Sequence, residues 1–356
     1  FRTANYKIRR KEIQKWNKKN RFIKKGIGIS PVKFGISFTL THLNQAGALV
    51  HVYLDGSIYL NHGGTEMGQG LFVKMAQVAA ESFGVDLSKI KISATNTSKI
   101  PNTSATAASS GSDLNGMATK IACEKIINRV KSILSKKYGV SETKIRFENN
   151  NIHLDNKIIK FSEGVAIAYE NRISLSATGY YATPEISWNR ETGKGQPFFY
   201  FAYGAAITEV AVDTLTGEMS LIRTDILHDC GRSLNVAIDI GQIEGGYAQG
   251  VGWLTSEELV WDKKGALMTH APSTYKIPCA SDRPKTLNIQ LWNDDNKQST
   301  IYRSKAVGEP PLMLGISAWL AISNAISSCG SNYPKLNAPA TPEQILNAIS
   351  RASDGD

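Results

Sequence analysis

The sequence predicts an α+β fold, and two observations lead to this class. Helical and strand patterns interleave along the chain without the regular strand–helix alternation of a parallel sheet. The chain has 356 residues, of which 42% are hydrophobic and 20% are charged, which is ordinary for a globular protein with a sizeable core. This length allows two or three compact domains, and no short internal repeat divides it.

Residues 1–25 are expected to form a basic helical lead-in, with a polar helix over residues 5–20. They hold eleven Lys or Arg and a single acid, Glu12, and so account for the whole net charge of +10. The rest of the chain has no excess charge for binding phosphates, so no nucleic-acid partner is expected. A solvated helix face is the plainer interpretation of the basic segment, and docking on an acidic partner is the alternative.

Residues 26–170 are expected to form a first α+β unit. Its strongest local signal is Asp55-Gly56, a two-residue turn between two segments of alternating hydrophobicity. The expected elements are, in order, a hairpin over 46–61, a glycine-rich loop over 63–70, a helix over 71–84, a strand over 89–94, a small-residue run over 101–116, a helix over 117–138 and a hairpin over 144–161.

Residues 171–356 are expected to form a second α+β unit. An aromatic-rich region over 174–203 precedes two strands that flank Asp213–Gly217. Further along, an apolar helix ends near Cys329. A last helix begins at Thr341-Pro342, because Thr can cap a helix and Pro suits the first helical position.

Several kinds of protein and site are not expected. The longest apolar segment, Leu312–Ser328, is interrupted by Ser and Asn and falls short of the roughly 20 apolar residues of a membrane span. The four cysteines are widely separated without a C-x-x-C, which indicates a reducing compartment, the cytoplasm, and argues against a zinc or iron–sulfur site. The histidines are also scattered, so no side chain is expected to bind a metal directly. Because the chain opens at Phe1 without a signal sequence, we expect a piece of a longer polypeptide.

The loops Gly63–Gly70 and Thr106–Gly116 are the first candidate binding elements, because each stands immediately before a helix. Glycine allows a ligand to approach the backbone closely, and a helix N-terminus directs free amides toward an anion. Neither loop has the spacing of a Walker A or a G-x-G-x-x-G motif. Tight turns between packed elements are the alternative, and the more frequent one on the residues alone.

Three side chains are further candidates. Gln69 and Gln242 carry amides that both donate and accept hydrogen bonds, which suits the edge of a heterocycle. Glu309 precedes two prolines, which favours an extended backbone, and desolvation by Val307 and Leu312 would make its carboxylate a better base. Ordinary loop hydrogen bonds and an exposed loop acid are the alternatives.

A set of longer segments is specific as a group. They are KFGISFTLTHLNQAGALVHVY (33–53), HGGTEMGQGL (62–71), PNTSATAASSGSDLNG (101–116), LSATGYY (175–181), FAYGAA (201–206), HDCGRSLN (228–235), AIDIGQIEGG (237–246), PSTYKIP (272–278) and SKAVGEPPL (304–312). Because these segments occur together and in this order, the chain resembles the xanthine dehydrogenase family. The resemblance is to the C-terminal half of the family's molybdenum-binding subunit, and most closely to the bacterial type. The stretch around Phe38 and LNQAGAL resembles xanthine dehydrogenase more than aldehyde oxidase.

The resemblance implies a molybdopterin cofactor, bound between two α+β lobes and holding molybdenum through its dithiolene sulfurs. The cofactor contacts that it implies are Met67, Gly68, Gln69, Thr106, Ala107, Ala108, Ser109, Ser110, Gly111, Ser112 and Gln242, with the Ala108 amide near the molybdenum. The substrate contacts that it implies are Phe38, Thr39, Val307 and Gly308, of which Phe38 and Thr39 wall a pocket for a stacked purine. Glu309 matches the family's catalytic base.

The implied reaction converts hypoxanthine and xanthine to xanthine and urate with water as the oxygen source. Glu309 accepts the proton of the attacking hydroxide, and the electrons leave through 2Fe-2S clusters and FAD to NAD. The clusters, the flavin and the upstream half of the molybdenum-binding subunit match no part of this chain. The resemblance therefore implies a chain that is incomplete and inactive alone and that belongs to an oligomer with an Fe-S/FAD subunit.

Other functions stay open on the sequence alone. One is an aldehyde oxidase or another heterocycle hydroxylase on the same scaffold. A second is a non-catalytic scaffold module, against which the joint presence of Gln69, Gln242 and Glu309 counts. A third, a basic nucleic-acid binder, depends on residues 1–25 alone.

Overall fold

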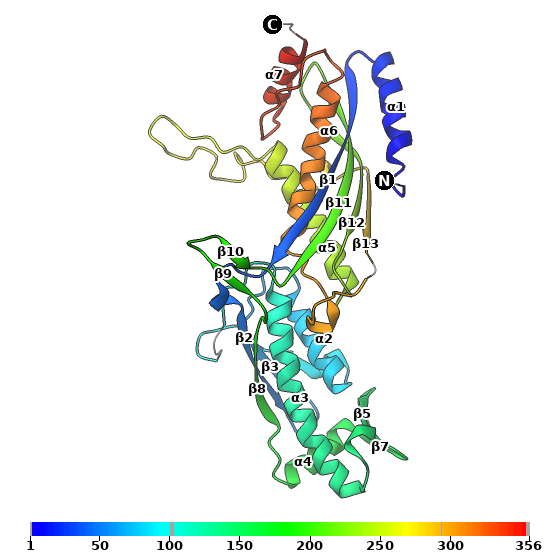
Figure 1. The fold of residues 1–356 in the computed structure, drawn as a ribbon, viewed down its shortest axis with the longest axis vertical. Helices are drawn as coiled ribbons and strands as arrows, with labels where there is room; N and C mark the ends of the chain where they lie inside the picture. The colour runs from blue at the N-terminus through cyan, green and yellow to red at the C-terminus, as the bar shows by residue number, and fades with distance from the viewer. Residues whose placement is uncertain (1, 100–102, 293, 354–356) are drawn as a thin grey trace.

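Two lobes lie end to end along the long axis of the molecule in the computed structural model, which describes residues 2–99, 103–292 and 294–353 (Figure 1). Phe1, Pro101 and Asn102 of the predicted segments lie outside the described residues. We call the two parts the lower lobe (residues 45–182) and the upper lobe (residues 6–36 and 200–353), after their places in Figure 1. The mixture of helices and sheets in both confirms the α+β prediction.

The lower lobe contains a four-stranded sheet of order β4-β3-β2-β8 and a small three-stranded sheet of order β5-β6-β7. Its strands are β2 (Gln45–Val52), β3 (Ile58–His62), β4 (Ile90–Ile92), β5 (Ile145–Glu148), β6 (Asn151–Leu154), β7 (Lys157–Lys160) and β8 (Ser176–Ala182). Its helices are α2 (Leu71–Phe83), α3 (Gly111–Tyr138) and α4 (Phe161–Glu170). The helix expected over 117–138 thus begins earlier, at Gly111, and the hairpin expected over 144–161 has a third strand.

The upper lobe contains a four-stranded sheet of order β1-β11-β12-β13, antiparallel except for the parallel pair β12 and β13. Its strands are β1 (Ile23–Ile36), β11 (Tyr200–Asp213), β12 (Met219–His228) and β13 (Thr286–Leu291). Its helices are α1 (Tyr6–Lys19), α5 (Val236–Thr255), α6 (Ile316–Ile326) and α7 (Pro342–Ser353). A separate two-stranded ribbon, β9 (Ser187–Asn189) and β10 (Lys194–Gln196), projects near the junction of the lobes (Figure 1).

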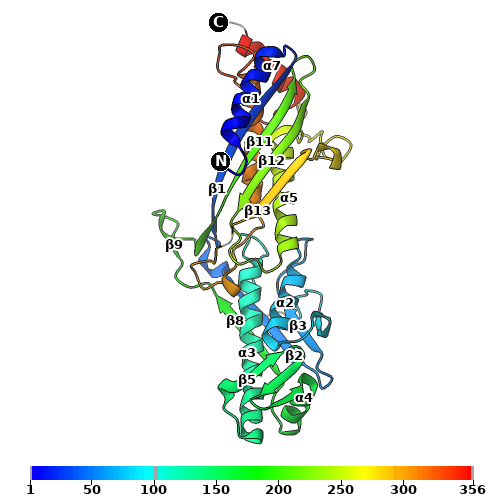
Figure 2. The same ribbon diagram turned by 90° about the vertical axis from the view of Figure 1, so that its right-hand side faces the viewer.

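The strand β1 supports helices on both faces of the upper sheet because successive residues of a strand point to opposite sides. Ile27 packs with Ile13 of α1 on one face. On the other face a Cβ at Gly26 or Gly28 would overlap the backbone of α6, so the glycines allow this helix to lie directly on the strand. Figure 2 shows α1 and α5 on opposite sides of this sheet.

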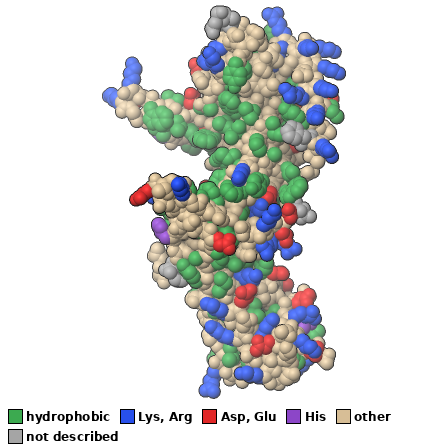
Figure 3. All heavy atoms as spheres, in the orientation of Figure 1, with side chains coloured by type: hydrophobic (Ala, Val, Ile, Leu, Met, Phe, Trp, Pro, Cys, Tyr) green, Lys and Arg blue, Asp and Glu red, His purple; other side chains and the backbone are tan. Residues whose placement is uncertain are grey.

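The basic segment forms the helix α1, as the sequence predicts, and it is anchored rather than loosely attached. The Arg9 side chain is buried and pairs with Glu209 at 2.9 Å and with Asp225 at 2.8 Å on the strands below it. Most of the other Lys and Arg side chains of this helix are exposed. Figure 3 shows basic side chains gathered along the right-hand edge of the upper lobe, where α1 lies in Figure 1.

The two lobes exchange strands, so they do not coincide with the predicted ranges 1–25, 26–170 and 171–356. The strand β1 pairs along its whole length with β11 and belongs to the upper sheet, although it lies in the predicted first unit. Conversely, β8 pairs with β2 and completes the lower sheet, although it lies in the predicted second unit. These pairings join residues far apart in sequence, which local patterns do not reveal.

Candidate functional site

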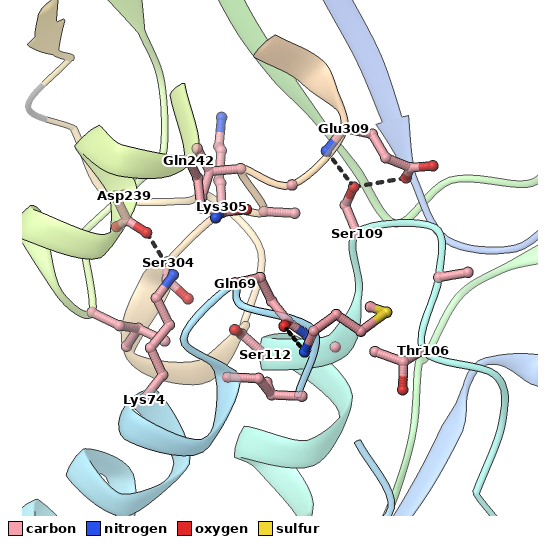
Figure 4. A pocket seen from close by; sticks show the side chains of 18 residues that line it. Gln69, Lys74, Thr106, Ser109, Ser112, Asp239, Gln242, Ser304, Lys305 and Glu309 are labelled. Atoms are coloured by element: carbon pink, nitrogen blue, oxygen red, sulfur yellow. Dashed lines mark hydrogen bonds and ion pairs between the residues drawn. The ribbon is translucent and has the colours of Figure 1, made fainter. Parts of the chain in front are cut away.

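A cavity of about 360 Å³ lies where the two lobes meet (Figure 4). The lower lobe contributes the loops that precede α2 and α3, and the upper lobe contributes the first turns of α5 and the loop that precedes η6 (Pro310–Gly315). The predicted site residues that line it are Met67, Gln69, Thr106, Ala107, Ser109, Gly111, Ser112, Gln242, Val307, Gly308 and Glu309. The fold thus brings both predicted loops, one glutamine of α5 and the candidate base to one place.

Some predicted residues of the two loops do not line the cavity themselves. Gly68 is exposed and Ser110 is buried, with its hydroxyl donating to the Ala107 carbonyl at 3.3 Å. Ala108 has a φ of 53°, in the left-handed region that side chains other than glycine rarely adopt. These residues shape the loops, and their neighbours form the cavity wall.

Phe38 and Thr39 are not among the cavity-lining residues, in contrast to the substrate wall that the resemblance implies. The Phe38 amide donates to Asn44 Oδ1 at 2.7 Å, and Asn44 Nδ2 donates back to the Phe38 carbonyl at 2.9 Å. This closed pair of hydrogen bonds holds the segment after β1 in a local turn of its own. The described cavity therefore has no aromatic wall from Phe38.

Glu309 lies at the rim of the cavity and is held by a residue of the opposite lobe. The Ser109 hydroxyl donates to Glu309 Oε2 at 2.7 Å and accepts from the Glu309 amide at 2.8 Å (Figure 4). The other carboxylate oxygen, Oε1, has no hydrogen bond to the described residues. It is therefore free to accept a proton from a bound molecule.

Two expectations about Glu309 are wrong. Its backbone has φ −93° and ψ −36°, which is helical rather than extended, because its carbonyl accepts from the Leu312 amide at 3.0 Å and begins η6. Its side chain is exposed rather than desolvated, because Val307 is turned into the core while the carboxylate faces Ser109. The following prolines stiffen this turn without forcing it into a strand-like conformation.

Contrary to the expectation from its composition, most backbone amides of the first glycine loop already have acceptors within the protein. The Glu66 carboxylate accepts from the amides of Gly68 at 2.9 Å, Gly70 at 3.0 Å and Phe72 at 2.8 Å. Burial raises the pKa of Glu66, but these amides outweigh it and bring the pKa below its usual value. A side chain of the loop thus takes the role that the sequence assigned to a ligand.

Gln69 is likewise engaged within its own loop. Its amide nitrogen donates to the Thr65 carbonyl at 2.8 Å, and its Oε1 accepts from the Met67 amide at 2.6 Å (Figure 4). These bonds fix the orientation of the glutamine at the cavity. A ligand that binds Gln69 through its amide edge has to share or replace them.

The second loop, in contrast, does present free amides. The backbone amides of Ala108 and Ser109, and those of Gly111, Ser112 and Asp113 in the first turn of α3, donate to no acceptor in the part of the chain that the structure describes. The positive end of a long helix dipole lies at the same place. This loop therefore fits an anionic group, as the sequence predicts.

Gln242 lines the cavity from α5 and is half-buried. Its side-chain amide makes no hydrogen bond with any described residue, so both its donor and its acceptor are available. The helix α5 begins at the cavity because the Asn235 side chain caps it by accepting from the Ile238 amide at 3.1 Å. Residues from the first turns of three helices, α2, α3 and α5, thus line one cavity.

A buried ion pair, Lys74 with Asp239, lines the cavity, although the sequence did not predict either residue as part of the site. Lys74 Nζ lies 2.5 Å from Asp239 Oδ1, and their side chains are only 8% and 3% exposed. Ser233 donates to the other oxygen of Asp239. The pair joins α2 to α5 and so joins the lobes. Lys74 falls on the apolar stripe of α2, and this break in the pattern is the signal that could have indicated a buried partner.

A second link between the lobes runs through Tyr200. Its hydroxyl donates to Asp113 Oδ2 at 2.6 Å and accepts from the Ala306 amide at 2.8 Å. Burial raises the pKa of Asp113 to about 7, although the hydrogen bond from Tyr200 and the charge of Lys74 oppose this rise. Neither residue is in the predicted site, and an isolated Tyr or Asp carries no local signal of such a pairing.

None of the described helices combines the length and the apolarity that crossing a bilayer requires. Within residues 2–99, 103–292 and 294–353, no three His, Cys, Asp or Glu side chains come together in a group able to hold a metal ion.

The sequence of residues 2–284 matches the family described as the molybdopterin cofactor-binding domain. The xanthine dehydrogenase/oxidase of Gallus gallus is 50% identical over 351 residues, which are 97% of this chain and 24% of that protein. The xanthine dehydrogenase of Dictyostelium discoideum is 46% identical over 350 residues, which are 96% of this chain and 24% of that protein. These identities confirm the resemblance to xanthine dehydrogenase, and the chain spans about a quarter of the length of these relatives.

Solved structures share the fold. The Cu,Mo-CO dehydrogenase matches 98% of this chain with a TM-score of 0.84 and 21% identity, over 44% of its own chain. Quinoline 2-oxidoreductase from Pseudomonas putida 86 matches 99% of this chain with a TM-score of 0.84 and 23% identity, over 45% of its own chain. The family match covers more than half of the chain. This protein therefore belongs to the molybdopterin cofactor-binding domain family.

Proposed function

We propose that this chain is the part of a xanthine dehydrogenase that holds one side of the molybdopterin cofactor and supplies Glu309 as the base for purine hydroxylation. One observation carries the proposal: Glu309 extends from the upper lobe over a cavity and is held there by Ser109 of the lower lobe. The identity of about half of the residues to xanthine dehydrogenases across 97% of the chain supports the same enzyme class.

The residues around the cavity fit this cofactor. Its phosphate is an anion, and the free amides of Gly111 and Ser112 at the start of α3 are suited to hold it. Its pterin edge offers donors and acceptors, which match the unpartnered amide of Gln242. When bound, the cofactor supplies the two-electron oxidation of the substrate carbon.

This chain's own part in the reaction is proton transfer and placement. Oε1 of Glu309 accepts the proton of the water-derived oxygen that attacks the purine, while Ser109 keeps Oε2 in place. Val307 and Gly308 bound the cavity beside the carboxylate and limit where a flat substrate can lie. The Ala108 amide lies in the same loop as Ser109, and we propose that it faces the reacting centre.

This chain covers about a quarter of its relatives, so we propose that further domains or subunits complete the enzyme. We propose that an upstream half of the molybdenum-binding subunit closes the cavity and covers the exposed Glu309. Phe38 and Thr39 belong to the substrate wall only if that closure brings them to the purine. We further propose 2Fe-2S clusters and FAD on other domains or subunits, NAD as the electron acceptor, an oligomeric enzyme and a cytoplasmic location.

The test is to express the chain together with the remaining domains found in its relatives and to measure bound molybdenum, bound pterin and substrate turnover. We expect stoichiometric cofactor and a preference for hypoxanthine and xanthine over aromatic aldehydes. A preference for aldehydes or other heterocycles would assign the chain to the alternative hydroxylases of the same scaffold. An assembled protein without pterin would indicate a non-catalytic scaffold module.

A further inference from the structure

We propose that Tyr200 and Asp113 are positioning residues. Through the hydrogen bond from the Ala306 amide to the Tyr200 hydroxyl, they fix the position of the segment Lys305–Glu309 relative to the cavity. This inference rests on the proposed role of Glu309 as the base. Neither side chain lines the cavity in which the proposed cofactor and substrate bind.

The contact is buried and continuous across the two lobes. Tyr200 is the first residue of β11 in the upper lobe and is 6% exposed, and Asp113 lies in the first turn of α3 in the lower lobe and is 8% exposed. The Tyr200 hydroxyl donates to Asp113 and accepts from Ala306, so a single oxygen joins a helix start, a strand start and the loop that carries the base.

The segment Ser109–Asp113 and the segment Lys305–Glu309 meet a second time at the surface. Ser109 and Glu309 form the exposed contact, while Asp113 and Ala306 lie a few residues along the same segments on the buried side. Water competes for an exposed hydrogen bond, whereas a buried donor that loses its partner finds no replacement. The buried contact therefore sets the separation of the two segments, and the exposed contact orients the carboxylate within it.

The tyrosine hydroxyl provides both bonds from this position. A hydroxyl donates and accepts at once, so it can serve a carboxylate and an amide together. Replacing Tyr200 by Phe leaves the ring in the core but leaves the Ala306 amide and the Asp113 carboxyl without a partner. The expected response is a shift of the loop toward other partners, which moves Glu309.

Tyr247 offers a matched control for the same substitution. It is 1% exposed, and its hydroxyl bonds Thr208 at 2.9 Å and Thr224 at 2.8 Å within the upper lobe. It does not line the cavity. Tyr247→Phe therefore removes a buried, doubly bonded hydroxyl without touching the segment Lys305–Glu309.

The experiment compares Tyr200→Phe and Tyr247→Phe in the assembled enzyme by hydrogen–deuterium exchange, pterin content and xanthine kinetics. For Tyr200→Phe we expect exchange at Ala306 to rise at least about tenfold, kcat to fall about tenfold or more, and KM and pterin content to stay within about threefold. For Tyr247→Phe we expect unchanged exchange in this segment and unchanged kcat. Wild-type exchange at Ala306 in Tyr200→Phe, or equal loosening in Tyr247→Phe, would overturn the proposal.

A second pair of variants decides the matter if Tyr200→Phe does not fold. Asp113→Asn keeps an oxygen that accepts from Tyr200, whereas Asp113→Ala does not. We expect the Asn variant to retain protected exchange and activity, and the Ala variant to behave as described for Tyr200→Phe. An Asn variant as impaired as the Ala variant would refute the positioning role. The exchange readout needs no turnover, so an assembled protein that does not oxidise purines would refute the proposed function and leave this test readable.

Discussion

The Ser109 hydroxyl contacts Glu309 twice, donating to its Oε2 at 2.7 Å and accepting from its backbone amide at 2.8 Å. Ser109 itself has a φ of 55°, in the left-handed region, so the loop is bent at this residue to reach the other lobe. One side chain thereby fixes both the backbone and the carboxylate of the candidate base. The small-residue loop thus positions the acid in addition to offering amides to a ligand.

Removing this hydroxyl tests the contact. In the assembled enzyme, Ser109→Ala is expected to lower kcat for xanthine by about three- to tenfold, because a hydrogen bond to a charged group is lost while the acid remains. Bound pterin should not change. Ser104→Ala is the control, since the Ser104 hydroxyl donates at 3.4 Å to the Gln45 carbonyl, outside the cavity lining. An unchanged kcat in Ser109→Ala would show that the contact does not orient Glu309.

The buried pair of Lys74 and Asp239 is expected to stabilise the joint between the lobes. Lys74→Met leaves Asp239 buried without its cation, which typically costs about 3–5 kcal/mol. Urea unfolding followed by fluorescence measures the shift of the midpoint. The exposed pair of Lys120 and Glu124, with side chains 36% and 52% exposed, provides the comparison, and Lys120→Met should cost less than about 1 kcal/mol. Similar shifts for both variants would contradict the buried-pair assignment.

Asp113 predicts a specific pH dependence of stability. Burial raises its pKa from 3.8 to about 7, so between these values the folded protein holds a proton that the unfolded chain releases. The Asp113 contribution to the free energy of unfolding therefore decreases as pH rises from about 4 to about 7 and is constant above. The ionisable groups that face it are Tyr200 from β11, Lys74 from α2 and Tyr181 from β8.

The measurement compares Asp113→Asn with the unaltered protein, because other groups titrate equally in both. The difference in free energy of unfolding, variant minus unaltered protein, should increase from pH 4.5 to pH 7.5 by a few kcal/mol, at about 1.4 kcal/mol per pKa unit. A difference that does not depend on pH would contradict the raised pKa.

For His228 we expect the opposite pH dependence, a free energy of unfolding that increases as the pH rises. Both ring nitrogens are buried without a hydrogen-bond partner among the described residues, and burial lowers the pKa to about 4, against the charges of Asp229 and Asp239 and together with that of Lys305. Stability from this group is present above pH 6.5 and is lost as the pH falls toward 4. The difference in the free energy of unfolding, His228→Leu minus unaltered protein, should therefore increase by about 2 kcal/mol when the pH is lowered from 7.5 to 5. Parallel pH profiles in thermal unfolding would refute this.

Local patterns predicted the elements well where the signal lies in neighbouring residues. The turn at Asp55-Gly56 joins β2 and β3 as expected, and the Thr341-Pro342 signal starts α7. The pairing of β1 with β11, in contrast, depends on residues that are far apart in the chain. Which lobe a strand joins is decided by that partner and not by its own alternation.

The sequence indicates part of the residue set of the candidate site but not its geometry. The motifs placed Glu309, Gln242 and the second loop, and the fold brings them to one cavity. The helical backbone of Glu309 and the capture of the first loop's amides by Glu66 follow from three-dimensional contacts that no spacing encodes. The pairing of Tyr200 with Asp113 is of the same kind.

Glu309→Gln in the assembled enzyme tests the central claim most directly. Glutamine keeps the length of the side chain and an oxygen for the Ser109 hydroxyl but does not accept a proton at neutral pH. We expect xanthine turnover to fall at least about a hundredfold, with bound molybdenum and pterin unchanged. Near-native turnover with a full complement of cofactor would contradict the assignment of Glu309 as the base.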